Sequence, residues 1–293
     1  MKYTIYAGAH GPLKIANLTE ACMLFSFMSF SCPSASVGEA LRMASEYGYD
    51  GFEPRIDVGH GHGLEIGAGA GTLRDARKAF EDLGKRICCV ATSCSYVDPD
   101  AAARDRAVER AKRAIDLAAA LGAPAIRVFG GLPPKGASRE ACLENVVGSL
   151  SKIAGQAASA GVAVCVETHD GWCDPAWMAR VMGGVDHPGV AVNWDIMHPV
   201  LTSGYTVADS YGILKRWVMH VHAHDGVLIE PAGDGYAKTE LRAMGSGDVD
   251  HGAALRLLGE DGYSGYVSGE WINWEPPEVH LPRELGRLRG YLR

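Results

Sequence analysis

The 293-residue sequence predicts a single-domain α/β protein built as a (β/α)8 TIM barrel. Short apolar runs alternate strictly with longer amphipathic stretches, which is typical of a parallel sheet whose strands are connected by helices. The apolar runs number eight, and eight parallel strands can close into a barrel. A doubly wound open sheet is the alternative, but the first run is followed by "SFSCPSASVG", which is not a glycine-rich phosphate loop.

Each apolar run predicts one strand, and the stretches between the runs predict helices. We expect strands at residues 23–30, 51–54, 86–92, 125–130, 162–168, 190–195, 217–222 and 265–270. We expect helices at residues 37–48, 72–84, 102–122, 138–161, 174–185, 206–216, 250–262 and 281–292. Several helices end in glycine, which adopts the left-handed conformation that closes a helix. Residues 1–20 precede the first strand as an N-terminal extension, and one domain is expected over 1–293.

Composition excludes several classes of protein. The formal charge of −7 argues against a general nucleic-acid or anionic-membrane surface. Eight cysteines are scattered without a CxxC pair, which indicates buried, reduced thiols in a cytoplasmic protein. The apolar stretch at 23–30 is too short to cross a membrane and lacks a basic segment before it, so a buried first strand is the better interpretation than a signal peptide.

Ionisable side chains collect where the later predicted strands end, which is the end of a barrel where function resides. The fifth strand ends at Glu167, the sixth at Asp195 and the eighth at Glu270. Side chains alternate along a strand, so inward-facing Glu167 and Asp195 imply that small or polar residues line the barrel interior, with valines outside under the helices. The seventh strand carries "HVHAHD", whose histidines share one face, and the local sequence allows a metal site, a proton relay or a histidine-rich strand.

Four motifs make the chain resemble a known family. They are "VETH" at 166–169, "DIMH" at 195–198, "HVHAHD" at 220–225 and "GSGDVDHGAALRLLGEDGYSGYVSGEW" at 245–271. With them the chain resembles the xylose isomerase-like TIM-barrel superfamily, in its sugar phosphate isomerase/epimerase branch. Members of that branch include ketose 3-epimerases, hydroxypyruvate isomerase and inosose dehydratase. The likeness extends from about residue 37 to the C-terminus.

The resemblance implies one divalent metal ion held by side chains from strands five to eight. Carried over by motif, the ligands are Glu167, Asp195, His222 and Glu270. Three carboxylates and one imidazole favour Mn²⁺, with Mg²⁺, Co²⁺ and Zn²⁺ as alternatives. An ion-pair network of unrelated strand-end residues is the structural alternative to a metal site.

The implied activity is that of a sugar isomerase or epimerase that moves a proton next to a carbonyl through a metal-stabilised enediolate. The resemblance assigns Glu167 and Glu270 as the acid–base pair. The same residues suit a lyase or dehydratase acting on a keto-sugar, inosose or keto-glycoside, which is the alternative. Ketose 3-epimerases usually carry a further Glu and Arg where this chain has "THDGWCDP" and "AHDGVLIE", so that particular activity is in doubt.

Further residues are candidates for binding a small sugar or polyol. They are His198, His169, His224, Arg55 and Trp271. An ion pair between Arg55 and Glu53 is the alternative for Arg55. His224 equally suits capping a loop, and Trp271, like Trp172 and Trp274, equally suits loop packing.

Two rival functions use the same fold. A three-zinc AP endonuclease needs extra histidine ligands after the third and fourth strands, where the chain reads "ATSCSY" and "RVFGGLPP". No nucleic-acid or membrane partner is therefore expected. A non-catalytic sugar-binding barrel has no need of a complete ligand set. Relatives often form dimers or tetramers, so the resemblance leaves a homo-oligomer open.

Overall fold

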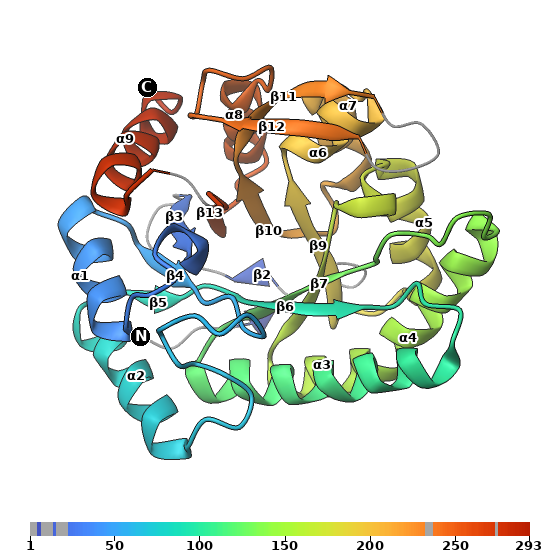
Figure 1. The fold of residues 1–293 in the computed structure, drawn as a ribbon, viewed down its shortest axis with the longest axis horizontal. Coiled ribbons are helices and arrows are strands. Elements are labelled where there is room, and N and C mark those ends of the chain that lie inside the picture. The colour runs from blue at the N-terminus through green and yellow to red at the C-terminus, as the bar shows by residue number, and fades with distance from the viewer. Residues whose placement is uncertain (1–4, 7–13, 16–22, 232–236, 273–274) are drawn as a thin grey trace.

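The computed structural model describes residues 5–6, 14–15, 23–231, 237–272 and 275–293. Within these residues, nine parallel strands form one sheet that curls into a nearly closed barrel, and helices surround it (Figure 1). The strands follow one another in the order β5-β4-β3-β13-β10-β9-β8-β7-β6. This arrangement confirms the (β/α)8 barrel prediction.

The nine strands occupy the eight positions that the apolar runs predict. They are β3 (Leu24–Met28), β4 (Gly51–Glu53), β5 (Arg86–Ile87), β6 (Val90–Ser95), β7 (Ala125–Phe129), β8 (Ala163–Glu167), β9 (Val190–Asp195), β10 (Val218–Ala223) and β13 (Tyr266–Gly269). The short β5 and the longer β6 are two parts of the third strand. Backbone bonds from Cys88 N to Phe52 O (3.0 Å) and from Ala91 N to Pro54 O (3.0 Å) continue the third strand alongside the second, which joins the two ends of the sheet.

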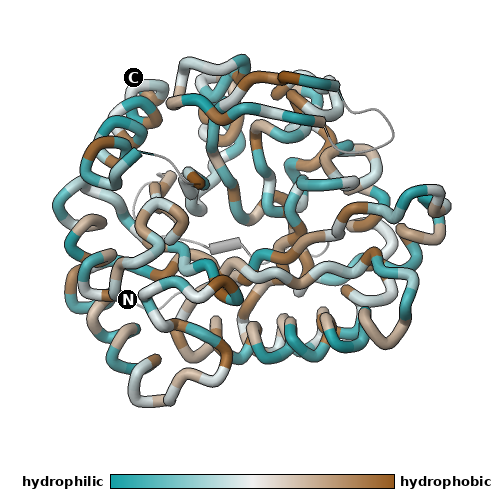
Figure 2. The backbone as a smooth tube through the Cα atoms, viewed as in Figure 1, coloured by the Kyte–Doolittle hydropathy of each residue, from teal (hydrophilic) through white to brown (hydrophobic). Residues whose placement is uncertain are grey.

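Helices connect the strands as predicted. They are α1 (Val37–Tyr47), α2 (Ala70–Asp82), α3 (Ala101–Leu121), α4 (Arg139–Ala160), α5 (Pro175–Val185), α7 (Val207–Leu214), α8 (His251–Glu260) and α9 (Pro277–Gly290). Ser36 and Glu39 form a reciprocal capping box at the start of α1. Gly122 and Gly161 end α3 and α4 at φ of 73° and 68°, in the left-handed region that favours glycine. Figure 2 shows hydrophilic and hydrophobic segments alternating along α3, as expected for a helix that covers a sheet with one face.

Several elements differ from the prediction. A short helix α6 (Met197–Ser203) follows β9, and a hairpin of β11 (Asp225–Glu230) and β12 (Lys238–Arg242) follows β10. Helix α9 begins at Pro277, four residues before the predicted start, with Pro282 inside it. The hairpin segments "DGVLIE" and "KTELR" pair with each other in a separate two-stranded sheet, and most of their residues are exposed or half-buried, so no buried apolar run marks them as strands.

Two apolar layers follow from the alternation of side chains along the strands. The layer inside the barrel is small and contains Cys88, Cys89, Ala125, Ala163, Cys165, Ala191 and Tyr266. The layer between the sheet and the helices is much larger and contains the predicted outward set Val164, Val166, Val190, Val192 and Val267. Small side chains low in the barrel leave room for the polar groups above them.

Three further expectations concern the N-terminal extension, the cysteines and membrane-spanning segments. Ile5–Tyr6 pairs antiparallel with Lys14–Ile15, and the rest of the predicted extension at 1–20 lies outside the described residues. The described cysteines are buried and free of disulfides, as the sequence indicates. In the part of the chain that the structure describes, no helix is long and apolar enough to cross a membrane.

Trp194 packs outward under α7, and its single polar atom is satisfied there. The indole Nε1 donates to Ser210 Oγ (3.0 Å), and the ring lies 5.1 Å from that of Tyr211. Both Trp194 and Ser210 are fully buried. Replacing Ser210 with Ala is expected to leave the buried indole N–H without an acceptor and to lower the free energy of unfolding by about 1–3 kcal/mol, measured by urea denaturation.

The control is the same substitution in a Trp194→Phe background, which has no indole donor. There Ser210→Ala should cost clearly less. An equal loss in the two backgrounds would show that the hydrogen bond is not what Ser210 contributes.

Candidate metal centre

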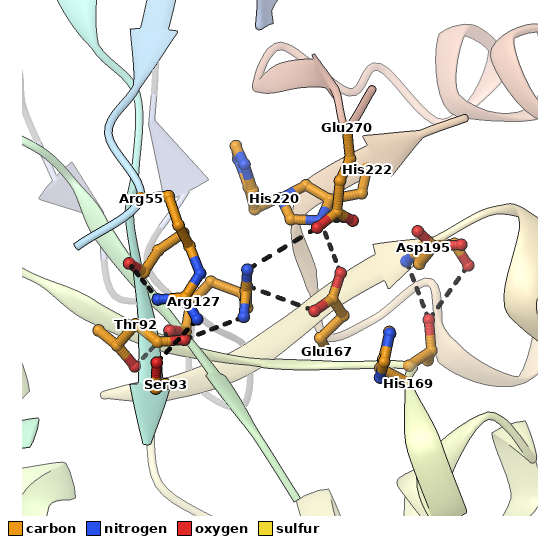
Figure 3. A network of polar contacts seen from close by, with 12 residues as sticks. Arg55, Thr92, Ser93, Arg127, Glu167, His169, Asp195, His220, His222 and Glu270 are labelled. Atoms are coloured by element: carbon orange, nitrogen blue, oxygen red, sulfur yellow. Dashed lines mark hydrogen bonds and ion pairs between the residues drawn. The ribbon is translucent and has the colours of Figure 1, made fainter. Parts of the chain in front are cut away.

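Four buried side chains converge at the carboxyl ends of neighbouring strands (Figure 3). Glu167 ends β8, Asp195 ends β9, His222 lies near the end of β10, and Glu270 directly follows β13. One ligand-type atom from each lies within 4.8 Å of the others. Two atoms that bind one ion at 2.0–2.3 Å are at most about 4.6 Å apart, so the spacing is close to that of a single ion. The structure thus brings together the four residues that the sequence predicts as metal ligands.

The strand register fixes the heights of these side chains. His222 lies beside Asp195 on one side and beside Ser268 on the other. Asp195 is held further by Thr168, whose Oγ1 accepts from Asp195 N (2.9 Å) and donates to Asp195 O (3.1 Å). Asp195 Oδ1 accepts from the backbone N–H groups of Met197 (2.8 Å) and His198 (3.0 Å) at the start of α6. The "DIMH" motif therefore uses one carboxylate oxygen to cap a helix and leaves Oδ2 for the site.

His222 joins the carboxylates of three strands. Its Nδ1 lies 2.6 Å from Glu167 Oε1 and 3.1 Å from Glu270 Oε2. Its Nε2 lies 3.1 Å from Glu53 Oε1, and Glu53 Oε2 lies 2.9 Å from His220 Nε2. His220 is thus a hydrogen-bonded histidine one layer deeper, as the alternation along the strand suggests. A metal ion on His222 could replace only the Nδ1 contacts, because Nε2 faces away from Glu167 and Glu270.

The electrostatics of the group favour ionised carboxylates. Burial alone would raise the pKa of Glu270, but the neighbouring His222 imidazole and the Arg127 guanidinium hold it at about 2. Burial likewise opposes charge on Asp195, and His224 and His198 keep its pKa below the usual range. Burial disfavours a charged His222, yet Glu53, Glu167 and Glu270 raise its pKa well above 6.5. The site therefore attracts positive charge, which a proton on His222 supplies here.

Arg127 is a second source of positive charge, and the sequence analysis missed it. Its Nε lies 3.3 Å from Glu167 Oε2, its Nη2 lies 3.8 Å from Glu270 Oε1, and its Nη1 donates to Thr92 O (3.0 Å). The side chain is 1% exposed. Burial would lower its pKa, but Glu167 and Glu270 raise it, so the guanidinium stays charged. The signal was a lone charged residue within an apolar strand, on the inward face with Ala125.

The donor set fits a divalent cation. Glu167 Oε2 is buried without a hydrogen bond, since Arg127 Nε at 3.3 Å does not align for one. Three carboxylates and one imidazole suit hard to borderline ions that prefer oxygen ligands. The ion pairs between His222, Glu167 and Glu270 also match the alternative of a purely structural network, and a metal titration separates the two interpretations.

Three of the predicted substrate-binding residues form a row of imidazoles beside the four-residue group. The ring centroids of His169 and His198 are 4.4 Å apart, and those of His198 and His224 are 5.1 Å apart. The row is flanked by carboxylates, because His169 Nδ1 lies 2.9 Å from Asp170 Oδ1 and His224 Nε2 lies 2.8 Å from Asp195 Oδ2. Burial lowers the pKa of His198 to about 3, so the middle imidazole is neutral.

Arg55 and Trp271 differ in their relation to the site. Arg55 extends toward Arg127 in Figure 3, and its Nη2 donates to Ser93 Oγ (2.8 Å). The predicted alternative, an ion pair between Arg55 and Glu53, is wrong, because the Glu53 carboxylate contacts His220 and His222. Trp271 is 1% exposed and packs edge-on against His280 of α9. The structure places Trp271 in the core, which matches its loop-packing alternative.

The two glycines of "GSG" at 245–247, in the last motif, are explained by the structure of the loop after β12. Asp225 Oδ2 accepts from Gly245 N (2.8 Å) and Gly247 N (3.0 Å), which ties the loop after β12 to the end of β10. A Cβ on Gly247 would lie 2.3 Å from Asp225 Oδ1, and Gly245 adopts φ of +80°. Asp225 therefore holds the loop, and both glycines are required by the backbone.

A family model described as "Xylose isomerase-like TIM barrel" matches residues 41–291 of the chain. The chain belongs to this family. The match covers all the barrel strands after β3 and the four converging residues. No curated protein matches the xylose isomerase-like chain by sequence.

Solved structures share the xylose isomerase-like fold at low identity. The E. coli 3-keto-D-glucoside 4-epimerase YcjR is 20% identical at a TM-score of 0.73, with 92% of this chain and 100% of that chain covered. The probable 3-DHS dehydratase AsbF of Bacillus anthracis is 19% identical at a TM-score of 0.73, with 91% and 99% covered. The IolI protein, solved with a bound zinc atom, is 16% identical at a TM-score of 0.75, with 92% and 96% covered.

The His169–Asp170 pair makes the imidazole row sensitive to pH. Burial would lower the pKa of His169, but the bond to Asp170 and the charge of Glu167 raise it from 6.5 to about 9. A raised histidine pKa contributes stability that is complete below pH 6.5 and is lost as the pH rises to about 9. In metal-free protein, the difference in thermal stability between wild type and the less stable Asp170→Asn variant should therefore be largest at pH 5–6.5. It should shrink as the pH rises toward 9.

Asn suits this position because Asp170 has φ of +50°, a conformation that Asn tolerates. Proton NMR of the His169 ring gives an independent measurement, with a titration midpoint that should fall in Asp170→Asn. An unchanged midpoint would show that Asp170 does not hold the proton on His169.

Proposed function

We propose that the protein is a divalent-metal-dependent sugar isomerase or epimerase that moves a proton on the carbon next to a carbonyl. The observation that carries the proposal is the convergence of Glu167 and Glu270 on one nitrogen of His222, at 2.6 and 3.1 Å, with Asp195 completing the group. One ionised glutamate can accept the substrate proton and, once protonated, return it to the neighbouring carbon, whereas forming an epimer requires the other glutamate to take a proton from solvent first and deliver it on the opposite face. Membership of the xylose isomerase-like family and the sugar epimerases among its structural neighbours support the proposal.

The proposed chemistry divides between the two glutamates. Glu270 is ionised at neutral pH, because the effect of burial on its pKa is outweighed by His222 and Arg127, which lower the pKa to about 2, and it is the group assigned to accept the proton from the substrate carbon. Glu167 comes from a strand three positions away in the sheet, so the two carboxylates reach the substrate from different sides. A bound divalent ion would supply Lewis-acid stabilisation of the oxygen charge that develops when the proton leaves, worth several kcal/mol. Positioned acid–base groups contribute roughly 10²- to 10⁴-fold in rate.

Mn²⁺ is the proposed ion, with Mg²⁺, Co²⁺ and Zn²⁺ as alternatives. Glu167, Asp195 and Glu270 offer oxygen ligands and His222 offers one nitrogen, a set without thiolate. The zinc atom in the IolI neighbour supports a divalent ion in this fold. The metal ion would bind at His222 Nδ1, the nitrogen that faces Glu167 and Glu270.

The charges of the site favour an uncharged sugar or polyol over a phosphorylated one. Four buried carboxylates (Glu53, Glu167, Asp195 and Glu270) face two buried guanidinium groups (Arg55 and Arg127), which leaves two negative charges. Asp170 balances the charge of the His169 imidazolium, and one divalent ion beside otherwise neutral imidazoles cancels the two remaining charges, so the loaded site needs no charge from its substrate. His198, His169, His224 and Arg55 are the proposed partners of the substrate oxygens.

A lyase or dehydratase that uses the same ligands is the second candidate. Expulsion of a β-hydroxyl or β-glycosyl group needs a proton donor beside the leaving oxygen. The pKa of His169, raised to about 9, makes its imidazolium a donor at the edge of the site. The dehydratase AsbF among the structural neighbours has the same fold.

Metal-free protein is expected to bind one divalent ion per chain. The expected stoichiometry is one Mn²⁺, measured by isothermal titration calorimetry and elemental analysis. Asp195→Asn keeps an acceptor for the α6 cap but removes the charge, and should weaken binding at least 10-fold. Asp209→Asn, at an exposed position in the first turn of α7, is the matched control and should bind as wild type does. A wild-type protein that takes up no divalent ion would leave the ion-pair network as the correct interpretation.

Loaded wild-type enzyme is expected to incorporate deuterium from D₂O into one carbon of its substrate. A screen of ketoses, inososes and keto-glycosides read by NMR identifies both the exchanged carbon and the product, which separates epimer, isomer and lyase outcomes. Glu270→Gln should abolish the exchange, at least about 10²-fold, since an amide accepts no proton at neutral pH. Bound metal is quantified in each sample, and full exchange by a metal-loaded Glu270→Gln variant would exclude Glu270 from the acid–base role.

A further inference from the structure

We infer that Glu53 is a positioning residue for the metal centre, because its carboxylate fixes the tautomer of His222 so that Nδ1 is the nitrogen available to a cation. Glu53 ends β4, while His222 lies on β10, and β3 and β13 separate these strands in the sheet. The contact between them therefore crosses the barrel interior. The inference rests on the proposed function, since it concerns how the chain prepares its metal ligand.

Short contacts to both carboxylate oxygens fix the orientation of the Glu53 side chain. Glu53 is fully buried, and its two oxygens are divided between two imidazoles. Oε1 lies 3.1 Å from His222 Nε2, and Oε2 lies 2.9 Å from His220 Nε2. The two rings pack edge to face with centroids 5.3 Å apart, side by side along β10 (Figure 3). His220 thus keeps the carboxylate from turning away from His222.

Hydrogen-bond chemistry then determines which nitrogen of His222 can bind a metal. An ionised carboxylate has no hydrogen to donate, so each Nε2 that contacts Glu53 must carry one. A neutral imidazole carries a single N–H, and with that hydrogen on Nε2 the lone pair lies on Nδ1. Nδ1 is the atom that faces Glu167 and Glu270. Glu53 therefore selects the tautomer and the ring orientation that the metal site requires.

Removing this carboxylate should weaken metal binding without removing a ligand. Partners that orient a metal-bound histidine typically contribute about 10- to 100-fold in metal affinity. Glu53→Gln keeps the length of the side chain, but its amide has one acceptor and one donor group for two imidazoles, so one histidine loses its fixed tautomer. Glu53→Asp keeps the charge, but its shorter side chain cannot span both imidazoles. A purely electrostatic role for Glu53 predicts that Asp restores wild-type affinity, whereas a positioning role predicts that it does not.

The test uses Zn²⁺ as the probe, because it is diamagnetic. The dissociation constant of metal-free full-length protein is measured by competition with a chelator for wild type, Glu53→Gln, Glu53→Asp and Glu284→Gln. Glu284 is a fully buried carboxylate of α9 that accepts from Met244 N (2.8 Å), so it controls for the loss of any buried charge. We expect both Glu53 variants to bind Zn²⁺ 10- to 100-fold more weakly and Glu284→Gln to bind as wild type does.

Nitrogen-15 NMR of the Zn²⁺-loaded proteins adds a readout that stability does not affect. Wild type should show a protonated Nε2 and a metal-bound Nδ1 for His222, and Glu53→Gln should lose one of the two slowly exchanging Nε2–H signals, that of His222 or that of His220. Unchanged affinity and an unchanged tautomer in both Glu53 variants would overturn the inference and leave the proposed function intact. Failure of wild type itself to bind Zn²⁺ or Mn²⁺ would overturn the proposed function and the inference with it.

Discussion

The burial of four carboxylates at one end of a closed barrel is the constraint on which the rest of the site depends. Ionised carboxylates removed from water are strongly destabilising unless positive charge lies beside them. Glu53, Glu167, Asp195 and Glu270 are each at most 5% exposed. Arg127 and the imidazoles of β10 supply part of the compensation within the chain. What remains is a localised negative potential at His222, which is the property that a cation site needs and an ordinary core avoids.

The barrel allows this concentration of buried charge because the ionisable residues come from different strands. Parallel register places the end of each strand at the same rim, so a single ionisable residue per strand is sufficient to build a cluster. Below the rim the interior is filled by small side chains such as Ala163, Cys165 and Ala191. Their size lets Arg127 and His220 reach inward, directly beneath the carboxylates. Substitution of large apolar residues there would displace the groups that hold the charge.

Local patterns in the sequence predicted the barrel and the strand-end carboxylates, whereas the family resemblance supplied the complete set of four converging residues. Strand–helix alternation defines the architecture, and strand-end position with a period of two defines which side chains share the mouth. The contact of Glu53 with His222 was not predicted because it crosses the barrel, and no spacing in the sequence encodes such a contact. Arg127 pairs with Glu167 of the neighbouring strand β8, and its signal, a lone charge on the inward face of an apolar strand, was overlooked. The position of Trp271 after the last strand suggested a residue at the mouth of the barrel. In the structure it packs against His280 of α9, and this contact depends on the placement of α9, which the sequence does not give.

The groups around the metal ligands, and not the ligands themselves, determine which product such a site forms. In the proposed function Glu167 and Glu270 account for proton removal, a step common to isomerases, epimerases and lyases. The two sides of the centre differ in character, with the guanidinium groups of Arg55 and Arg127 on one and the imidazole row that begins at His169 on the other. A substrate bound between them has one side against fixed cations and the other against groups that exchange protons. Under the proposed function, the second proton comes from a glutamate in an isomerase or epimerase, and from the imidazole row in a lyase, where it goes to the leaving group.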